Sequence, residues 1–353
     1  MRYLLVLLVA LLCTLPATAQ RAVRADLAFS PDGTLAATST GTGTLLIWNA
    51  DDWSLQRRYA GDGERLFGFA FSSDSRYVAF GSNGGRLAVM DLTTGTLVFD
   101  VQDRSGSVNV ARFGSDGTTP DGLLFAAGEG RTLTSHAWRT GTPGRVYDLG
   151  RDTMPNGSPL IVEDFDVVPE RGWLFVARFD GQARLMDIAT GEVVHAWTAK
   201  LRPRDGQRNV KDVAVLPGGR TGFFAGVGGD VIAVDLDTGV RIDSVRVHPD
   251  FVSKLTSGPD GRLLAALDLD GNTTLLDPTA FGDPDGTPIV KQMTQTASFS
   301  SRRLLFAGEF RPGVDQFVTG GIRLPLIVWD TGSGARLRTV ERLPEVAAAD
   351  ARE

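Results

Sequence analysis

Charged side chains recur at matching places along the chain, just before a repeated position that is Phe in four of seven copies. Counted back from that position by one or three residues, they are Arg112, Asp164, Asp166, Asp212, Lys254 and Glu309. Because side chains alternate between the two faces of a strand, residues one and three places before the same position point in one direction. Carboxylate oxygens are ligands for hard cations, so this set predicts a polar channel that holds a cation or a small polar ligand. The alternative is a water-filled channel whose charges offset one another.

A second group of cations lies in the long connection AKLRPRDGQRN, which carries one acid among four cations. With the arginine of a neighbouring turn they form a predicted partner-binding set: Arg178, Lys200, Arg202, Arg204 and Arg208. Arginine forks suit carboxylates, and long loops on a rigid scaffold often carry function. The set predicts contact with an acidic peptide or loop of a partner. The alternative is a solvated connection.

From the remaining polar residues and motifs we predict neither a catalytic residue nor a metal site nor a cofactor. Residues 268–272, DLDGN, resemble part of a calcium loop but lack its closing Glu, so a turn is predicted. His136, His195 and His248 fall at non-equivalent places without a partner at ligand spacing. The sequence holds neither a serine nucleophile elbow nor a glycine-rich phosphate loop that leads into a helix.

The candidate residues belong to a repeat. A phrase of the form apolar–Phe–x–Pro–Asp–Gly recurs in seven copies, complete as AFSPDG at residues 28–33 and altered in the other six. In six copies the residue 17 places after the Pro or its equivalent is apolar, as Trp48 is after Pro31, and Asn or Asp follows it. The third copy reaches Trp138 after 23 residues because its first turn is longer. Equal spacing of this kind is typical of stacked structural units.

Each repeat predicts four short strands separated by turns rich in Gly, Asp, Asn and Pro. Many strands, such as LLIW and VIAV, are apolar on both faces, which suits a sheet between two neighbouring sheets. Radial stacking buries both faces. The predicted fold is all-β, a single seven-bladed β-propeller of four-stranded antiparallel blades at about residues 23–60, 64–101, 106–148, 159–198, 208–246, 250–290 and 305–340. The ring then needs no exchange of a terminal strand, and residues 341–353 form a short acidic tail.

The chain resembles the WD-repeat family, in a secreted bacterial type, over residues 23–340. FSPDG at residues 29–33, followed by IWN at 47–49 and elsewhere by VWD at 328–330 and a Thr-Gly turn, is that family's phrase. The resemblance implies a non-enzymatic, rigid platform for protein–protein interaction. Since the family's Gly-His dipeptide is missing, we expect plain apolar packing in place of the His-centred hydrogen bonds inside each blade.

Residues 181–197 are also similar to the pyrroloquinoline-quinone-type propeller repeat. The alternative function is therefore a quinoprotein-like enzyme, or a propeller that binds a small ligand or cation in its central channel. A flat aromatic floor at the channel mouth would favour the enzyme, and no Trp or Phe falls at the aligned mouth positions.

The first 19 residues predict a cleaved export signal. Arg2 gives a positive start, residues 4–15 are almost wholly apolar, and residues 17–19 have the A-x-A form of a signal-peptidase site. The apolar run is shorter than the roughly 20 residues of a membrane span. We expect a periplasmic or secreted protein that begins at Gln20 and does not span a membrane. The rival is a lipoprotein anchored at Cys13, which Leu12 in the preceding position disfavours.

Composition narrows the kinds of partner. There are 36 Lys and Arg against 42 Asp and Glu, and this acidic balance argues against nucleic-acid binding. The one Cys lies in the predicted signal, so the exported chain would have neither a thiol nor a disulfide. We expect a protein partner and a monomer. A third possibility is a structural subunit bound along the outer blade edges, but the outer strands WSLQRRYA and ARLRTVER are charged.

Overall fold

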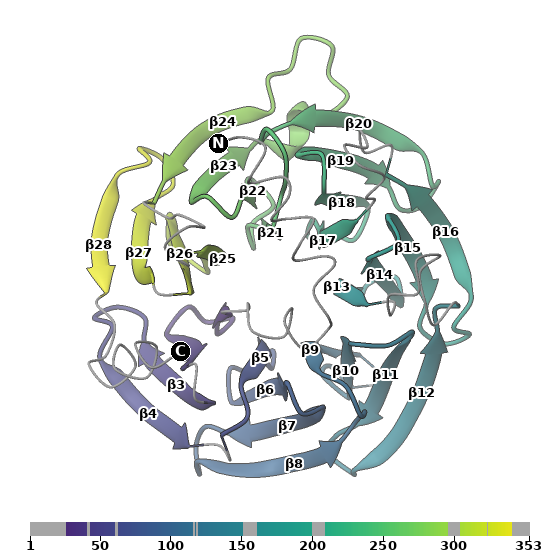
Figure 1. The fold of residues 1–353 in the computed structure, drawn as a ribbon, viewed down its shortest axis with the longest axis vertical. Helices are drawn as coiled ribbons and strands as arrows, with labels where there is room; N and C mark the ends of the chain where they lie inside the picture. The colour runs from purple at the N-terminus through teal and green to yellow at the C-terminus, as the bar shows by residue number, and fades with distance from the viewer. Residues whose placement is uncertain are drawn as a thin grey trace.

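The computed structural model describes residues 26–40, 43–60, 63–115, 117, 119–150, 161–199, 209–295, 304–322 and 324–340. Over these ranges the chain forms seven four-stranded antiparallel sheets, arranged as blades around a central channel (Figure 1). The predicted all-β, seven-bladed propeller is confirmed. The predicted signal at residues 1–19 and the predicted tail at residues 341–353 lie outside the described residues.

Each blade uses four consecutive strands, named a to d from the channel outwards. Blades 1 and 2 contain β1 (Leu27–Phe29), β2 (Leu35–Ser39), β3 (Thr44–Asn49), β4 (Leu55–Ala60), β5 (Leu66–Phe71), β6 (Tyr77–Ser82), β7 (Arg86–Asp91) and β8 (Thr96–Gln102). Blades 3 and 4 contain β9 (Val108–Gly114), β10 (Leu123–Gly128), β11 (Thr132–Ala137), β12 (Thr142–Asp148), β13 (Val162–Val168), β14 (Trp173–Arg178), β15 (Gln182–Asp187) and β16 (Val193–Thr198).

The remaining three blades complete the ring. Blade 5 contains β17 (Val210–Val215), β18 (Thr221–Gly226), β19 (Asp230–Asp235) and β20 (Arg241–Arg246). Blades 6 and 7 contain β21 (Lys254–Ser257), β22 (Leu264–Leu267), β23 (Asn272–Leu276), β24 (Ile289–Thr294), β25 (Leu304–Arg311), β26 (Gln316–Ile322), β27 (Leu324–Asp330) and β28 (Arg336–Val340). The connection from β23 to β24 holds the 3₁₀ helix η1 (Pro278–Ala280). Because this connection is long, β24 runs to Thr294, past the predicted end of blade 6 at residue 290.

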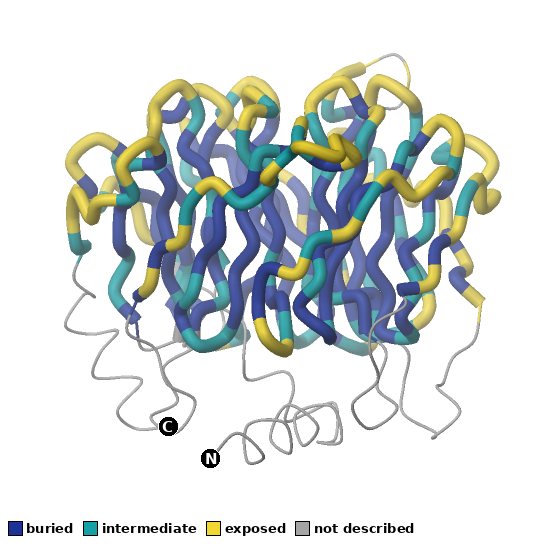
Figure 2. Tube along the Cα trace, turned by 90° about the horizontal axis from the view of Figure 1, so that it is seen from above, coloured by how far each residue is buried: buried dark blue, intermediate teal, exposed yellow. Residues whose placement is uncertain are grey.

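The core lies between the blades rather than within any one of them. Ile47 of blade 1, for example, packs in one buried cluster with Phe69 and Phe80 of blade 2. Strands a to c are therefore mostly buried, while the turns at the rims are exposed (Figure 2). Burial of both sheet faces explains why these strands are apolar on both sides.

The ring closes without a shared strand, as the sequence predicts. Blade 1 takes all four of its strands from the beginning of the described chain and blade 7 all four from its end. Phe29 of blade 1 packs with Val318 and Val328 of blade 7. Arg311 also reaches across this seam, where its Nε donates to the Gly33 carbonyl oxygen over 2.9 Å and its Nη2 pairs with Asp51. Noncovalent contacts alone therefore join the two ends of the ring.

The equal spacing among the copies of the repeat has a structural cause at the end of strand c. The residue at the 17-residue spacing is buried in all six copies, as is Trp138 in the third copy. The Asn or Asp after it accepts a backbone N–H of the following turn; Asp187, for instance, accepts from Thr190 over 2.7 Å. Asp235 does the same with Thr238 over 2.8 Å. A short acceptor at this place holds the turn that leads into strand d.

The expectation of plain apolar packing inside the blades is wrong in part. In blade 7, Trp329 Nε1 donates to Thr319 Oγ1 over 2.8 Å, and Thr319 donates to Gln295 Oε1 over 2.7 Å. In blade 1, Trp48 donates to Thr38 over 2.9 Å. The sequence did not predict these bonds because the Gly-His dipeptide of the family is missing. In blade 7 the final acceptor is instead Gln295, which lies in the connection between blades 6 and 7.

Candidate functional site

The central channel contains a cavity of about 280 Å³. Its walls include the residue one place before the repeated position, which is Phe29 in blade 1, in all seven blades: Ala28, Ala70, Arg112, Asp166, Ala214, Thr256 and Glu309. Asp26 and Lys254, three places before that position, lie deeper along the same walls. The period of two along strand a therefore places one side chain per blade in a single cavity.

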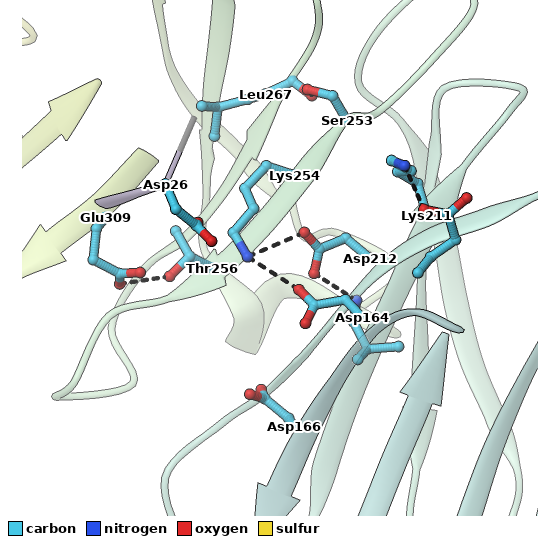
Figure 3. A network of polar contacts seen from close by, with 12 residues as sticks. Asp26, Asp164, Asp166, Lys211, Asp212, Ser253, Lys254, Thr256, Leu267 and Glu309 are labelled. Carbon is cyan, nitrogen blue, oxygen red and sulfur yellow. Dashed lines mark hydrogen bonds and ion pairs between the residues drawn. The ribbon is translucent and has the colours of Figure 1, made fainter. Parts of the chain in front are cut away.

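Lys254 is the centre of the charged cluster (Figure 3). Its Nζ lies 3.1 Å from Asp164 Oδ2 and 3.2 Å from Asp212 Oδ2, so it bridges blades 4 and 5 from blade 6. Arg112 of blade 3 lies on the other side of Asp164, with its Nη2 3.4 Å from Asp164 Oδ1. Asp164 and Asp212 are buried, which strengthens these ion pairs through the lower local dielectric.

The two buried acids of the cluster hold different charges. Burial alone would raise the pKa of Asp164, but Lys254 and Arg112 hold it well below its ordinary value. Burial and the neighbouring Asp164 charge raise the pKa of Asp212 well above its ordinary value. The pair therefore keeps one proton on Asp212 at pH values where an exposed Asp has lost it. Burial disfavours the charged form of Lys254, yet the two carboxyl groups raise its pKa above the ordinary value.

Asp166 and Glu309 face the cavity above this cluster. Asp166 Oδ2 accepts the Val215 backbone N–H over 3.0 Å, and its Oδ1 lies 3.9 Å from Arg112 Nε. Glu309 Oε1 accepts from Thr256 Oγ1 over 2.8 Å. Burial is the main cause that raises the pKa of both carboxyl groups. Both acids thus keep acceptor oxygens toward the cavity.

All six predicted channel residues come together, but the sequence left out two of their neighbours. Asp26 of blade 1 accepts the Gly68 backbone N–H over 2.5 Å, and Thr256 bonds Glu309. Both stand at aligned positions of the repeat, which is the signal that would have found them. Glu163 and Lys211 pair with each other one residue before Asp164 and Asp212, where a β-bulge interrupts each strand a. A bulge cannot be read from the side-chain period alone.

The cavity extends toward one particular face of the ring. It runs from Asp26 and Lys254 to Pro259 and Pro312, which begin the turns between strands a and b of blades 6 and 7.

The predicted partner-binding set is corrected at one residue. Arg178 is buried, with 2% of its surface exposed, so it is not presented to a partner. Its Nη1 donates to the Leu149 carbonyl oxygen and its Nη2 pairs with Asp180 over 2.7 Å. The arginine ends strand β14 instead of lying in a surface turn, and a backbone carbonyl and the Asp180 carboxylate use two of its donors. Lys200, Arg202, Arg204 and Arg208 lie outside the described residues.

The described residues hold neither a metal site nor a membrane-crossing helix. Across those ranges, no three His, Cys, Asp or Glu side chains are placed to hold a metal ion. The described ranges also contain no helix that is long and apolar enough to cross a membrane.

Comparison with known proteins found similarity to WD-repeat sequences. The family described as "WD domain, G-beta repeat" matches residues 11–49. A stretch of 164 residues is 28% identical to WD repeat-containing protein SL1-17 of Schistosoma mansoni and covers 46% of this chain. Both matches fit a WD-repeat-like propeller. The second match spans 50% of that relative's length.

Proposed function

We propose that the WD-repeat-like propeller is an exported, non-enzymatic scaffold that binds another protein. The observation that carries this proposal is the joint occurrence of a seven-bladed ring and WD-repeat relatives, since WD-repeat propellers typically act as protein-interaction scaffolds. The seven interblade cores make the ring rigid, while its rim turns remain exposed. A rigid ring with many exposed turns presents a preorganised surface, which lowers the entropic cost of binding.

We assign the partner surface to the basic segment of Lys200, Arg202, Arg204 and Arg208. The described residues on both sides of this segment are anchored: Ala199 and Asn209 are buried. The Ala199 N–H donates to the Gly181 carbonyl oxygen over 3.0 Å. Four cations around one acid, attached to such fixed ends, favour an acidic segment of a partner.

Replacement of Arg202, Arg204 and Arg208 by Glu together should abolish capture of the partner. The measurement is cross-linking and affinity capture from the envelope fraction of the source cell, with the captured protein identified by mass spectrometry. The matched control carries Arg241→Glu, Arg336→Glu and Arg338→Glu, which make the same change in charge at exposed positions of outer strands. If both variants still capture the partner, the basic segment is not the partner surface. If the parent chain captures no defined protein, the scaffold role is wrong.

Export through residues 1–19 is part of the proposal. In a cell that exports the chain, the mature protein should begin at Gln20, because cleavage follows the A-x-A site at residues 17–19. Intact-mass measurement of the protein from the periplasm or the medium checks this. A product that retains residues 1–19, or one that carries lipid at Cys13, would contradict it.

A further inference from the structure

The channel cavity carries more negative charge than its own cations neutralise. Five acids gather around two cations: Asp26, Asp164, Asp166, Asp212 and Glu309 around Arg112 and Lys254. Even with a proton on Asp212, the four other acids outnumber the two cations by two. The two cations are already engaged by Asp164, so the excess falls on Asp26 and, nearer the open end, on Asp166 and Glu309.

These two acids present acceptors to a space of limited size. Each makes one short hydrogen bond with the protein, Asp166 with the Val215 N–H and Glu309 with Thr256. The 3.9 Å between Asp166 Oδ1 and Arg112 Nε is too long for a hydrogen bond. Ala28, Ala70 and Ala214 of blades 1, 2 and 5 keep the wall recessed elsewhere around the cavity. At about 280 Å³ the cavity is at the lower limit of ligand pockets, which suits a small group rather than a large cofactor.

The placement of the acids decides which kind of cation fits. A metal ion needs several oxygen ligands within coordination distance, and the described residues do not gather three such side chains anywhere. An ammonium or guanidinium group instead spreads its donors over a wider space and can bond carboxylates that lie apart. Asp166 and Glu309 also repel each other, and a cation between them would relieve that repulsion.

We propose that the cavity binds one small organic cation, an ammonium or guanidinium group, between the carboxylates of Asp166 and Glu309. The group enters from the face that carries the turns between strands a and b, where the cavity reaches Pro259 and Pro312. It is either a free amine or guanidine, or the side chain of a Lys or Arg residue in a peptide. This binding does not depend on the scaffold role, because a free amine would bind even if the basic segment had no protein partner.

The test is calorimetric titration of the purified chain with four probes. These are propylammonium, methylguanidinium, and blocked Gly-Lys-Gly and Gly-Arg-Gly peptides. At least one probe should bind saturably at a 1:1 ratio, and Glu309→Gln and Asp166→Asn should each weaken it on the order of tenfold or more. Glu192→Gln, the same charge change on an exposed turn residue, should leave the affinity unchanged. Tighter binding of the free cations identifies a metabolite-like ligand, whereas tighter binding of a peptide identifies a side chain.

A second variant keeps the proposal testable if the charge variants lose their fold. Ala70→Met fills the recessed wall without a change in charge, so it should also weaken binding of the probe. Thermal melts establish that each variant is folded. The proposal is overturned if none of the four probes binds saturably. It is equally overturned if uncharged propanol binds as well as propylammonium, or if folded Glu309→Gln and Glu192→Gln bind alike.

Discussion

Lys254→Met should destabilise the propeller by about 3 kcal/mol or more at neutral pH. Methionine keeps most of the length of the lysine side chain but removes the charge that lies 3.1 Å from Asp164 and 3.2 Å from Asp212. Asp164 would then remain buried with Arg112 as its cation, at the longer distance of 3.4 Å. Breaking a buried ion pair by removal of one partner is costly because the other charge stays desolvated. Urea unfolding of the parent and the variant measures the difference.

The loss should depend on pH in a defined direction. The lowered pKa of Asp164 in the folded parent contributes stability above the ordinary carboxyl range, and this contribution disappears as the pH falls. In the variant, protonation of the acids at low pH removes the uncompensated charge, so the difference from the parent should shrink there. The double variant Lys254→Met, Asp164→Asn should recover part of the loss at neutral pH. A single variant within about 1 kcal/mol of the parent at neutral pH would show that the cluster is solvated rather than desolvated.

Gly68→Ala should destabilise the fold by a comparable amount, about 3 kcal/mol. Gly68 lies in a β-bulge of β5 with φ +63°. A Cβ there would lie 2.7 Å from Val110 Cα and 2.8 Å from both Ala111 N and Asn109 O of the next blade. These neighbours are backbone atoms, so they cannot move aside as a flexible side chain would. The substitution would force blades 2 and 3 apart beside the channel and disturb the bond from the Gly68 N–H to Asp26.

Gly141→Ala separates this steric effect from the effect of backbone conformation. Gly141 has φ +73°, close to that of Gly68, but a Cβ there meets no atom within 4 Å. Its substitution should cost only about 1 kcal/mol, the penalty of a left-handed conformation for an L-residue. Chemical denaturation of the two variants side by side gives the comparison. Equal losses would mean that the approach of blades 2 and 3 contributes nothing.

The channel cluster connects these two predictions. Lys254 ties blades 4, 5 and 6 together, and Arg112 adds blade 3. Gly68 and Asp26 tie blades 1 and 2 on the other side of the channel. Since the ring closes without a shared strand, polar contacts around the channel complement the apolar interblade cores in holding the blades in register.

The sequence by itself determined the repeat, the number of blades and the direction of the strand-a side chains. The 17-residue spacing predicts the repeat because six of the copies place a buried residue and a turn-capping Asn or Asp at the same point of the blade. Side-chain alternation predicts which residues of strand a face the channel because it is a local property of any strand. From these two facts the sequence placed Arg112, Asp164, Asp166, Asp212, Lys254 and Glu309 in one channel.

Only the tertiary structure decided which of these groups pair and what charge each carries. Arg112 and Lys254 are far apart in the chain, so their sharing of Asp164 depends on how blades 3, 4 and 6 meet. The burial of Arg178 and the face toward which the cavity opens likewise follow from packing between blades. Pairing and desolvation depend on neighbours brought from distant parts of the chain, whereas periodicity depends only on residues next to one another.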